Sequence, residues 1–233
     1  MHDVRLHLIG GFEVTVDGVS IEGLQPAMQR LLAFVALAPR GVEREFAALQ
    51  LWPDTTEERA RANLRSALWR LRRLPVKLVG DGASRLRLRD DVWVDAHHGV
   101  DALTMGDDDG GLERTLPFQS LLSDLLPDWY DEWLTIERER LRQLCVRGIE
   151  ARAAASLAAG DISAAIQSAL TAMSMDPLRE SAHRVLIEAH LAEGNEWEAR
   201  RTLDGYRERI ACDPRLRPSA ELLALVDGAP LAV

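Results

Sequence analysis

An internal repeat in the second half of the chain restricts the possible folds more than any other feature. Five small or apolar residues recur at a constant step of 34 positions: Ala155, Leu157, Ala158, Gly160 and Ala165 reappear as Ala189, Leu191, Ala192, Gly194 and Ala199. A helix–turn–helix unit of about 34 residues is the period of the tetratricopeptide repeat. The repeat therefore predicts closely packed helix pairs, with tight turns at Gly160-Asp161 and Gly194-Asn195.

Further helices are expected on either side of the repeated units. A long helix should begin after Pro127 and run to about Ala159. It would cap the array, because two repeats are fewer than the three usually needed for a stable stack. Asp176-Pro177 and Asp213-Pro214 indicate the starts of later helices, since proline is favoured at the first helical position.

The first residues of the chain follow a different period. Val4–Gly10 and Phe12–Val16 alternate apolar and polar side chains, as half-buried strands do. Asp17-Gly18 is a signal for a tight hairpin turn, and Val19–Ile21 follows it. A small antiparallel sheet is predicted at the start of the chain.

Three helices should follow this sheet. The first is expected over Gln25–Ala38 and the second over Arg44–Trp52. The third is expected to begin at Thr55, which forms a capping box with Glu58, and to end at Pro75.

A hairpin is expected after the third helix. Val76–Val79 and Arg85–Leu88 flank a turn-rich stretch at 80–84, and Val92–Val94 is a candidate for one more strand. The order of sheet, three helices and hairpin is typical of a winged helix. The predicted fold class is therefore mainly α with a small N-terminal β component: a winged helix-turn-helix domain at 1–96, a tetratricopeptide-like helical domain at 97–227 and a tail at 228–233.

The formal net charge of −9 is not evenly distributed along the chain. Residues 1–95 carry 14 Lys and Arg against 13 Asp and Glu, whereas the remainder carries 14 against 24. Six arginines lie at positions 59–73, on the third predicted helix. The acidic excess thus lies outside the part of the chain where a basic surface is expected.

A helical wheel for the third helix separates these arginines from its apolar stripe. Small residues bordered by arginines suit a major groove, because they permit close approach while guanidinium groups reach phosphates or guanine edges. In the hairpin, Arg85, Arg87 and Arg89 alternate, so they share a strand face that is expected to touch the neighbouring phosphate backbone or the minor groove. The candidate DNA-binding residues derived in this way are Arg59, Asn63, Arg65, Ser66, Arg70, Arg73, Arg85 and Arg87.

A second interpretation remains open. Arginine-rich helical faces are often only solvated, and Lys77 is the sole lysine among 28 basic residues, which is typical of a GC-rich genome. Under this interpretation the protein is an interaction scaffold of tetratricopeptide type with a degenerate winged helix that does not bind DNA.

Motifs for catalysis and for cofactors or metal ions are absent from the sequence. It has no P-loop, dinucleotide-binding, nucleophile-elbow or zinc-protease pattern, so we expect no enzyme, no catalytic residues and no cofactor. His97-His98 is interpreted as a cap at the domain junction, and the aspartates within Gly106–Gly111 as a solvated loop, so no metal site is expected.

The expected location is the cytoplasm. The two cysteines, Cys145 and Cys212, show no paired spacing, which suits a reducing compartment. No apolar run approaches the roughly 18 residues of a membrane span, and the start of the chain lacks a signal-peptide pattern.

Specific stretches also resemble a known family. Residues 25–95 resemble the OmpR-type winged helix of the actinobacterial antibiotic regulatory (SARP) family, and residues 97–225 resemble its bacterial transcriptional activator domain. The matching stretches are Gln29-Arg30, Leu51-Trp52, Ala60-Arg61, Leu64, 68–73, 126–133, 137–141, 176–183 and 192–195.

This resemblance implies a function. SARP regulators bind direct repeats of promoter DNA and contact RNA polymerase to activate target operons, so double-stranded DNA, RNA polymerase and a homodimeric partner are expected. The family's recognition-helix arginines correspond to Arg70, Arg72 and Arg73. The sequence departs from the family at the wing, where Gly82-Ala83-Ser84-Arg85 replaces a Gly-Tyr pair, and around 105–116, where the chain is shortened.

Overall fold

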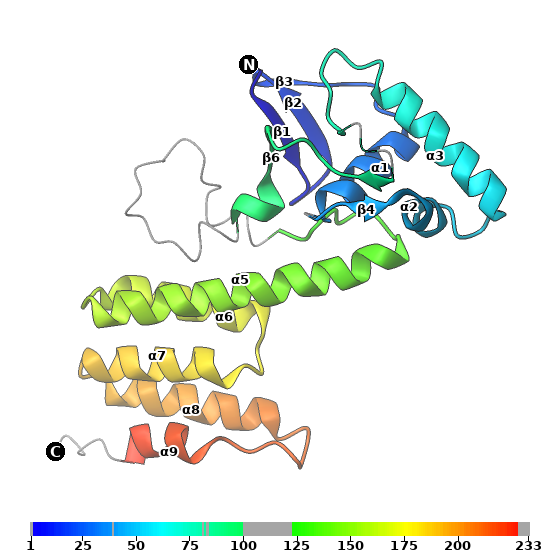
Figure 1. The fold of residues 1–233 in the computed structure, drawn as a ribbon. Helices are drawn as coiled ribbons and strands as arrows, with labels where there is room; N and C mark the ends of the chain where they lie inside the picture. Colours follow the sequence, from blue (N-terminus) through cyan, green and yellow to red (C-terminus); the bar gives the residue numbers. More distant parts are fainter. Residues whose placement is uncertain (1, 39, 81, 83, 100–122, 228–233) are drawn as a thin grey trace. The chain divides into compact units, whose positions relative to one another are not determined.

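The computed structural model describes residues 2–38, 40–80, 82, 84–99 and 123–227. The described chain divides into two compact units (Figure 1): the first contains residues 2–99 and 123–141, and the second contains residues 142–227. A small sheet and three helices open the first unit, and helices alone build the second. The predicted fold class is confirmed.

A four-stranded sheet lies at the start of the first unit. Its strands are β1 (Val4–His7), β2 (Glu13–Val16), β3 (Val19–Ser20) and β6 (Val92–Val94), in the order β3-β2-β1-β6. β1 pairs antiparallel with β2 and parallel with β6. Asp17 and Gly18 both have positive φ, 51° and 80°, as the central residues of a type I′ hairpin turn require. The predicted hairpin is confirmed, and β6 closes the sheet from residues far along the chain.

Three helices pack beside this sheet: α1 (Pro26–Ala36), α2 (Arg44–Leu51) and α3 (Glu57–Leu71). Leu31, Leu32 and Leu51 are fully buried between them. A two-stranded ribbon joins β4 (Val42–Glu43), directly before α2, to β5 (Arg85–Leu86) in the wing. The ribbon ties the wing to the start of α2, a pairing that the sequence pattern did not predict.

The structure corrects both ends of α3. The N-cap is Thr56, whose side chain accepts a hydrogen bond from the Arg59 backbone N–H, and not Thr55. The Thr55 hydroxyl instead donates to the carbonyl of Trp52 at 3.0 Å. α3 ends at Leu71, before the predicted end at Pro75, because the residues between them form tighter turns toward a proline that disfavours helix in the residue preceding it.

The predicted wing hairpin exists in a shorter form than expected. Val79 and Leu88 form one isolated bridge, and backbone hydrogen bonds join Gly80 to Arg87 and Arg89 to Leu78. β5 pairs with β4 instead of with the strand predicted at 76–79.

Residues 123–141 belong to the first unit, although the sequence predicted that the second domain begins at residue 97. The Leu126 N–H donates to the Leu8 carbonyl at 2.8 Å. The Phe12 and Trp129 rings stack with centroids 5.7 Å apart, and Trp133 meets Phe34 edge-on at 5.0 Å. Aromatic contacts and a backbone bond therefore hold this segment on the winged helix.

Helix α5 (Glu132–Ala158) belongs to both units: residues 132–141 belong to the first and residues 142–158 to the second. It begins at Glu132, five positions after the Pro127 that we expected to precede it. Arg138 donates to the carbonyls of Leu125, Leu126 and Trp129, so backbone groups just before α5 are satisfied by a side chain from its second turn.

The second unit confirms the 34-residue repeat. α5 and α7 (Glu180–Ala192) end 34 positions apart, and α6 (Ile162–Met175) and α8 (Glu196–Ile210) begin 34 positions apart. Asp161 and Asn195 are equivalent N-caps, each accepting a backbone N–H three residues on. Helix α9 (Ala220–Asp227) covers the end of α7 and α8 with Leu222 and Val226.

The prolines of the second unit lie outside its helices. Pro177 and Pro214 sit in turns, so α7 begins at Glu180 and α9 at Ala220. The prediction that Asp176-Pro177 and Asp213-Pro214 begin these helices is wrong. Asp176 is the C-cap of α6, and the Pro177 carbonyl accepts from the buried ring of His183.

Three expectations fall on residues that the structure does not describe: the loop at Gly106–Gly111, the shortening at 105–116 and the tail at 228–233. In the described part of the chain, the helices are all too short or too polar to cross a membrane. The domain boundary expected between residues 96 and 97 stays a prediction.

Candidate nucleic-acid interface

Helix α3 has one buried and one exposed face. Ala60, Leu64, Ala67, Leu68 and Leu71 form the buried stripe, as the helical wheel indicated. Every arginine predicted as a DNA contact on this helix or directly after it is exposed, as is Ser66, whereas Asn63 is half-buried at the margin. The exposed set comprises Arg59, Arg65, Arg70, Arg72 and Arg73.

The middle of the exposed face carries small side chains, and the arginines beside them make few contacts within the protein. Ser66 turns its hydroxyl back to the Ala62 carbonyl at 3.0 Å, so it adds little bulk. Within the described residues, the guanidinium groups of Arg59 and Arg65 have no ion-pair or hydrogen-bond partner. Two full positive charges therefore flank a strip of small side chains.

The C-terminal end of α3 positions two further arginines. Arg70 donates to the side-chain carbonyl of Gln25, which orients its guanidinium group without neutralising it. The Arg73 guanidinium lies 4.7 Å from the ring centroid of Trp69, a side chain that is 58% exposed. A cation–π contact of this kind restricts Arg73 while leaving its charge intact.

Arg61, on the same helix, contrasts with these residues. It forms ion pairs with Glu45 of α2 and with Glu57 one turn earlier. Its hydrogen bond to Glu45 raises the pKa of Arg61 above the ordinary value. Arg61 thus links α2 to α3 and is not among the unpaired charges of the exposed face.

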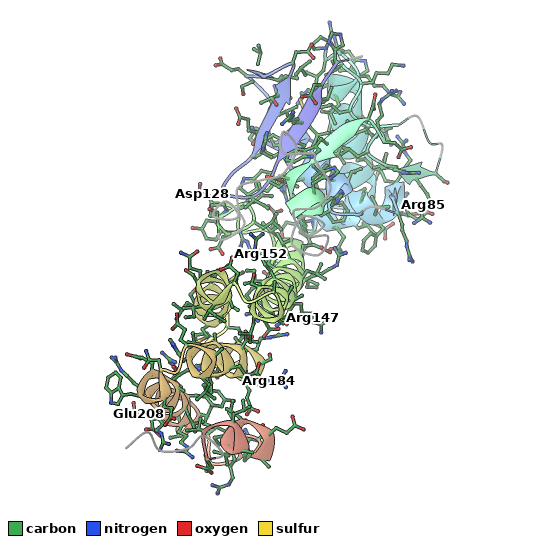
Figure 2. All side chains as sticks on the ribbon, turned by 90° about the vertical axis from the view of Figure 1, so that its left-hand side faces the viewer. Arg85, Asp128, Arg147, Arg152, Arg184 and Glu208 are labelled. Carbon is green, nitrogen blue, oxygen red and sulfur yellow. The ribbon has the colours of Figure 1, made fainter. Side chains whose placement is uncertain are left out.

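The wing arginines are exposed but carry neighbouring carboxylates. Arg85 projects from the first unit (Figure 2), where it pairs with Glu43 at 3.3 Å and donates to the Gly41 carbonyl at 3.0 Å. Arg87 pairs with Asp90. The net positive charge of the wing is therefore lower than the alternation of arginines suggested.

Arg89 follows the same arrangement. It donates to both carboxylate oxygens of Asp91, at 2.8 and 2.9 Å, and this hydrogen bonding lowers the pKa of Asp91. The succession Arg89-Asp90-Asp91 is visible in the sequence, and its acidic pair is the signal that could have predicted this neutralisation.

The region of His97 and His98 has a structural arrangement. His98 stacks on Trp93, with centroids 5.3 Å apart and ring planes 2° from parallel. Asp95 is buried and accepts the backbone N–H groups of Leu8, Ile9 and Ala96. Burial raises the pKa of Asp95, and the hydrogen bonds from the three backbone N–H groups partly offset this rise. Asp95 therefore ties the end of β1 to the start of the helical residues 95–99 that follow β6.

The described residues contain no group of three or more His, Cys, Asp or Glu side chains that could hold a metal ion.

The second half of the chain resembles a known domain family. Residues 120–227 match the family model of the bacterial transcriptional activator domain. Residues 123–141 of this match belong to the first compact unit, so the family match and the compact units of the fold have different limits.

The fold of the whole chain has a solved counterpart. The structure of Mycobacterium tuberculosis EmbR in complex with a low affinity phosphopeptide matches with a TM-score of 0.75 and 22% sequence identity. The match covers 100% of this chain and 67% of the EmbR chain. No curated protein sequence matches the chain.

The match of residues 120–227 and the likeness of the fold agree with the resemblance to SARP-type regulators, which predicted an OmpR-type winged helix followed by an activator domain. The description of the matched domain supports a role in transcriptional regulation in general terms.

Proposed function

We propose that the protein is a sequence-specific regulator that binds double-stranded promoter DNA through the exposed face of α3. The observation that carries the proposal is the combination of Arg59 and Arg65, which lack acidic partners among the described residues, with the small side chains of Ala62 and Ser66 between them. A helix with this pattern can approach base edges closely while its long cationic side chains reach the phosphates on either side.

Different arginines have different roles in this proposal. Arg59, Arg65 and Arg72 contact phosphates and set the register of the helix in the major groove. Arg70 and Arg73, held by Gln25 and by Trp69, are oriented before binding and read guanine edges. Asn63 is available to an adenine edge at the margin of the face.

The wing contributes less to the affinity for DNA than α3 does. Arg85 and Arg87 would reach the neighbouring phosphate backbone, but each must share its charge with Glu43 or Asp90. We therefore assign most of the affinity to α3.

The resemblance to SARP regulators supports the remaining parts of the proposal. The protein acts in the cytoplasm as an activator that contacts RNA polymerase, with two protomers on direct repeats. A spacing of about 10–10.5 bp would place both recognition helices on one side of the duplex.

The test is binding to duplexes selected from a genomic fragment library, measured by fluorescence anisotropy at several salt concentrations. Arg70→Ala should weaken binding to the selected site by roughly 1–3 kcal/mol and relax the base preference. Arg59→Ala and Arg65→Ala should each reduce the slope of log K against log[salt] by about 0.9, because each removes one phosphate contact.

Arg201→Ala is the matched control. Arg201 has a 67% exposed side chain paired with Glu198 in the second unit, so its removal changes the net charge equally without touching α3. If Arg70→Ala and Arg201→Ala bind the selected duplex alike, α3 is not the reading element. If no duplex is enriched even at low salt, the scaffold interpretation replaces the regulator.

A further inference from the structure

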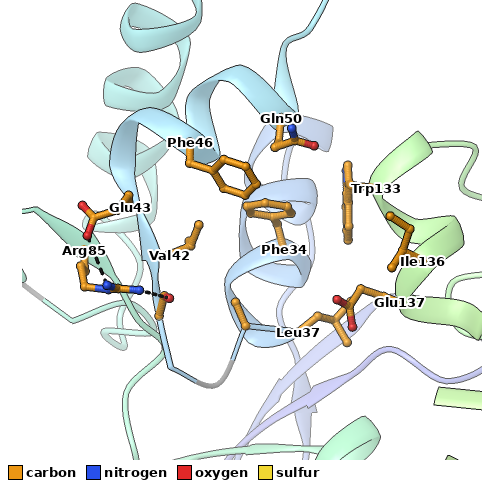
Figure 3. Close-up of a pocket in the computed structure, with 12 residues that line it drawn as sticks. Phe34, Leu37, Val42, Glu43, Phe46, Gln50, Arg85, Trp133, Ile136 and Glu137 are labelled. Carbon is orange, nitrogen blue, oxygen red and sulfur yellow. Dashed lines mark hydrogen bonds and ion pairs between the residues drawn. The ribbon is translucent and has the colours of Figure 1, made fainter. Parts of the chain in front are cut away.

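We infer that a pocket in the first unit binds an uncharged aromatic small molecule. The pocket has a volume of about 590 Å³ and lies among α1, β4, α2 and the first turns of α5 (Figure 3). Cavities that hold small ligands usually measure about 300–1,000 Å³, are mostly apolar and present a few polar groups. The size alone therefore admits a multi-ring compound.

The walls are aromatic on two sides. Phe34 and Phe46 have ring centroids 6.3 Å apart, and Trp133 meets Phe34 edge-on from α5. Phe46 is 54% exposed and Ile136 is 73% exposed, although both line the pocket. Covering this apolar surface is favourable because it removes apolar area from water, and aromatic faces favour a ring-containing ligand over a flexible chain.

The charges at the rim indicate an uncharged ligand. Arg85 already pairs with Glu43, and Glu137 already pairs with Arg140 at 3.1 Å. Figure 3 shows Arg85 and Glu43 on one side of the pocket and Glu137 on the opposite side. A charged ligand would have to displace one of these pairs or lose its hydration without a counter-ion, which is costly in an apolar site.

One polar group remains for recognition. The Gln50 side chain lines the pocket, and within the described residues its amide has no hydrogen-bond partner. An amide supplies both a donor and an acceptor, so it suits a single hydroxyl or carbonyl group on the ligand. The volume, the aromatic walls and this one amide together favour an aromatic compound with one polar substituent.

The test uses the whole chain and the uncharged probe N-phenyl-1-naphthylamine. The probe should bind with one saturable site, seen as an increase in its fluorescence and as quenching of tryptophan emission. Ala38→Phe, which places a ring in the pocket from its α1 side, should weaken binding at least tenfold. Phe46→Ala, at an exposed wall position where the fold is little affected, should weaken it several-fold.

The control is Val19→Ala, which removes an exposed apolar side chain on β3, away from the pocket, and should leave binding unchanged. The anionic probe 1-anilinonaphthalene-8-sulfonate should bind more weakly than the uncharged one. Equal binding by wild type, Ala38→Phe and Phe46→Ala would overturn the proposal, as would tighter binding of the anionic probe.

Sedimentation of the same variants distinguishes a ligand from a second copy of the chain. If the wild type is a dimer that Ala38→Phe and Phe46→Ala convert to a monomer, the pocket holds a neighbouring chain and the proposal is wrong. None of these measurements involves DNA, so their outcome is independent of the proposed function.

Discussion

At the scale of single residues, the close approach of β4 and β5 depends on Gly41. It has a φ of 72°, and a Cβ at this position would meet the Leu86 carbonyl at 2.8 Å. It stands directly before β4, where its own carbonyl accepts from Arg85. Only glycine allows the β4–β5 ribbon to approach so closely at this point.

Gly41→Ala should therefore lower the free energy of unfolding by about 1–3 kcal/mol, through backbone strain combined with the clash. Urea unfolding of the two variants Gly41→Ala and Gly23→Ala measures the separate contributions. Gly23 has a similar φ of 75° with open space around the added Cβ, so its replacement shows the strain alone. Equal losses in both variants would mean that the contact with Leu86 is unimportant.

At the scale of elements, α3 depends on its first turn. The Thr56 side chain satisfies one of the backbone N–H groups that a helix start leaves unpaired, and Glu57 and Glu58 place negative charge where the helix dipole favours it. Thr55 stands next to it but bonds to Trp52.

We expect Thr56→Ala to destabilise the first unit by about 0.5–2 kcal/mol, the usual cost of removing an N-cap side chain. Thr55→Ala should cost less, because it removes only an exposed hydrogen bond to a turn. Thermal unfolding of both variants provides the comparison, and a larger loss for Thr55→Ala would restore the capping box that the sequence suggested.

This shift of one residue shows where sequence reasoning reaches its limit. Both threonines satisfy the local rule for a cap, and only the contact with Trp52 separates them. The buried stripe of α3 was predictable because it depends on side-chain spacing along one helix, and the 34-residue period because the same residues recur in the sequence itself. The packing of Trp129 and Trp133 on the winged helix was not, because a local pattern shows that a face is apolar without showing which surface covers it.

The candidate site divides in the same way. The helical wheel predicted which arginines of α3 are exposed. It could not predict that Arg61 turns to Glu45, or that Arg85 turns to Glu43 across the β4–β5 ribbon, since these pairs join residues brought together only by the fold.

At the scale of the whole molecule, a buried titratable group makes the second unit sensitive to acid. His183 is fully buried, its Nε2–H donates to the Pro177 carbonyl at 3.0 Å and its ring packs on Tyr206. Burial lowers the pKa of His183 below its ordinary value near 6.5, with a further contribution from the nearby Arg209, while the hydrogen bond and Glu180 oppose the shift.

Because the unfolded chain binds a proton at His183 more readily than the folded chain does, the second unit should lose stability as pH falls from about 6.5 toward the lowered pKa. Amide hydrogen exchange, followed separately in α7 and in α3 between pH 7 and pH 5 after correction for intrinsic rates, measures this effect. His183→Gln, whose amide keeps a donor for the Pro177 carbonyl, should flatten the dependence in α7. The same slope in the variant and the wild type would assign the acid sensitivity to other groups.

The segment at 123–141 also determines how the chain can be divided. A fragment that stopped at residue 96 would keep the helix with the arginines but lose Trp129 and Trp133, the rings that rest on Phe12 and Phe34. Those two phenylalanines, together with the Leu8 carbonyl that Leu126 now occupies, would then face solvent. A fragment that keeps the winged helix covered must therefore extend into the residues that match the activator domain.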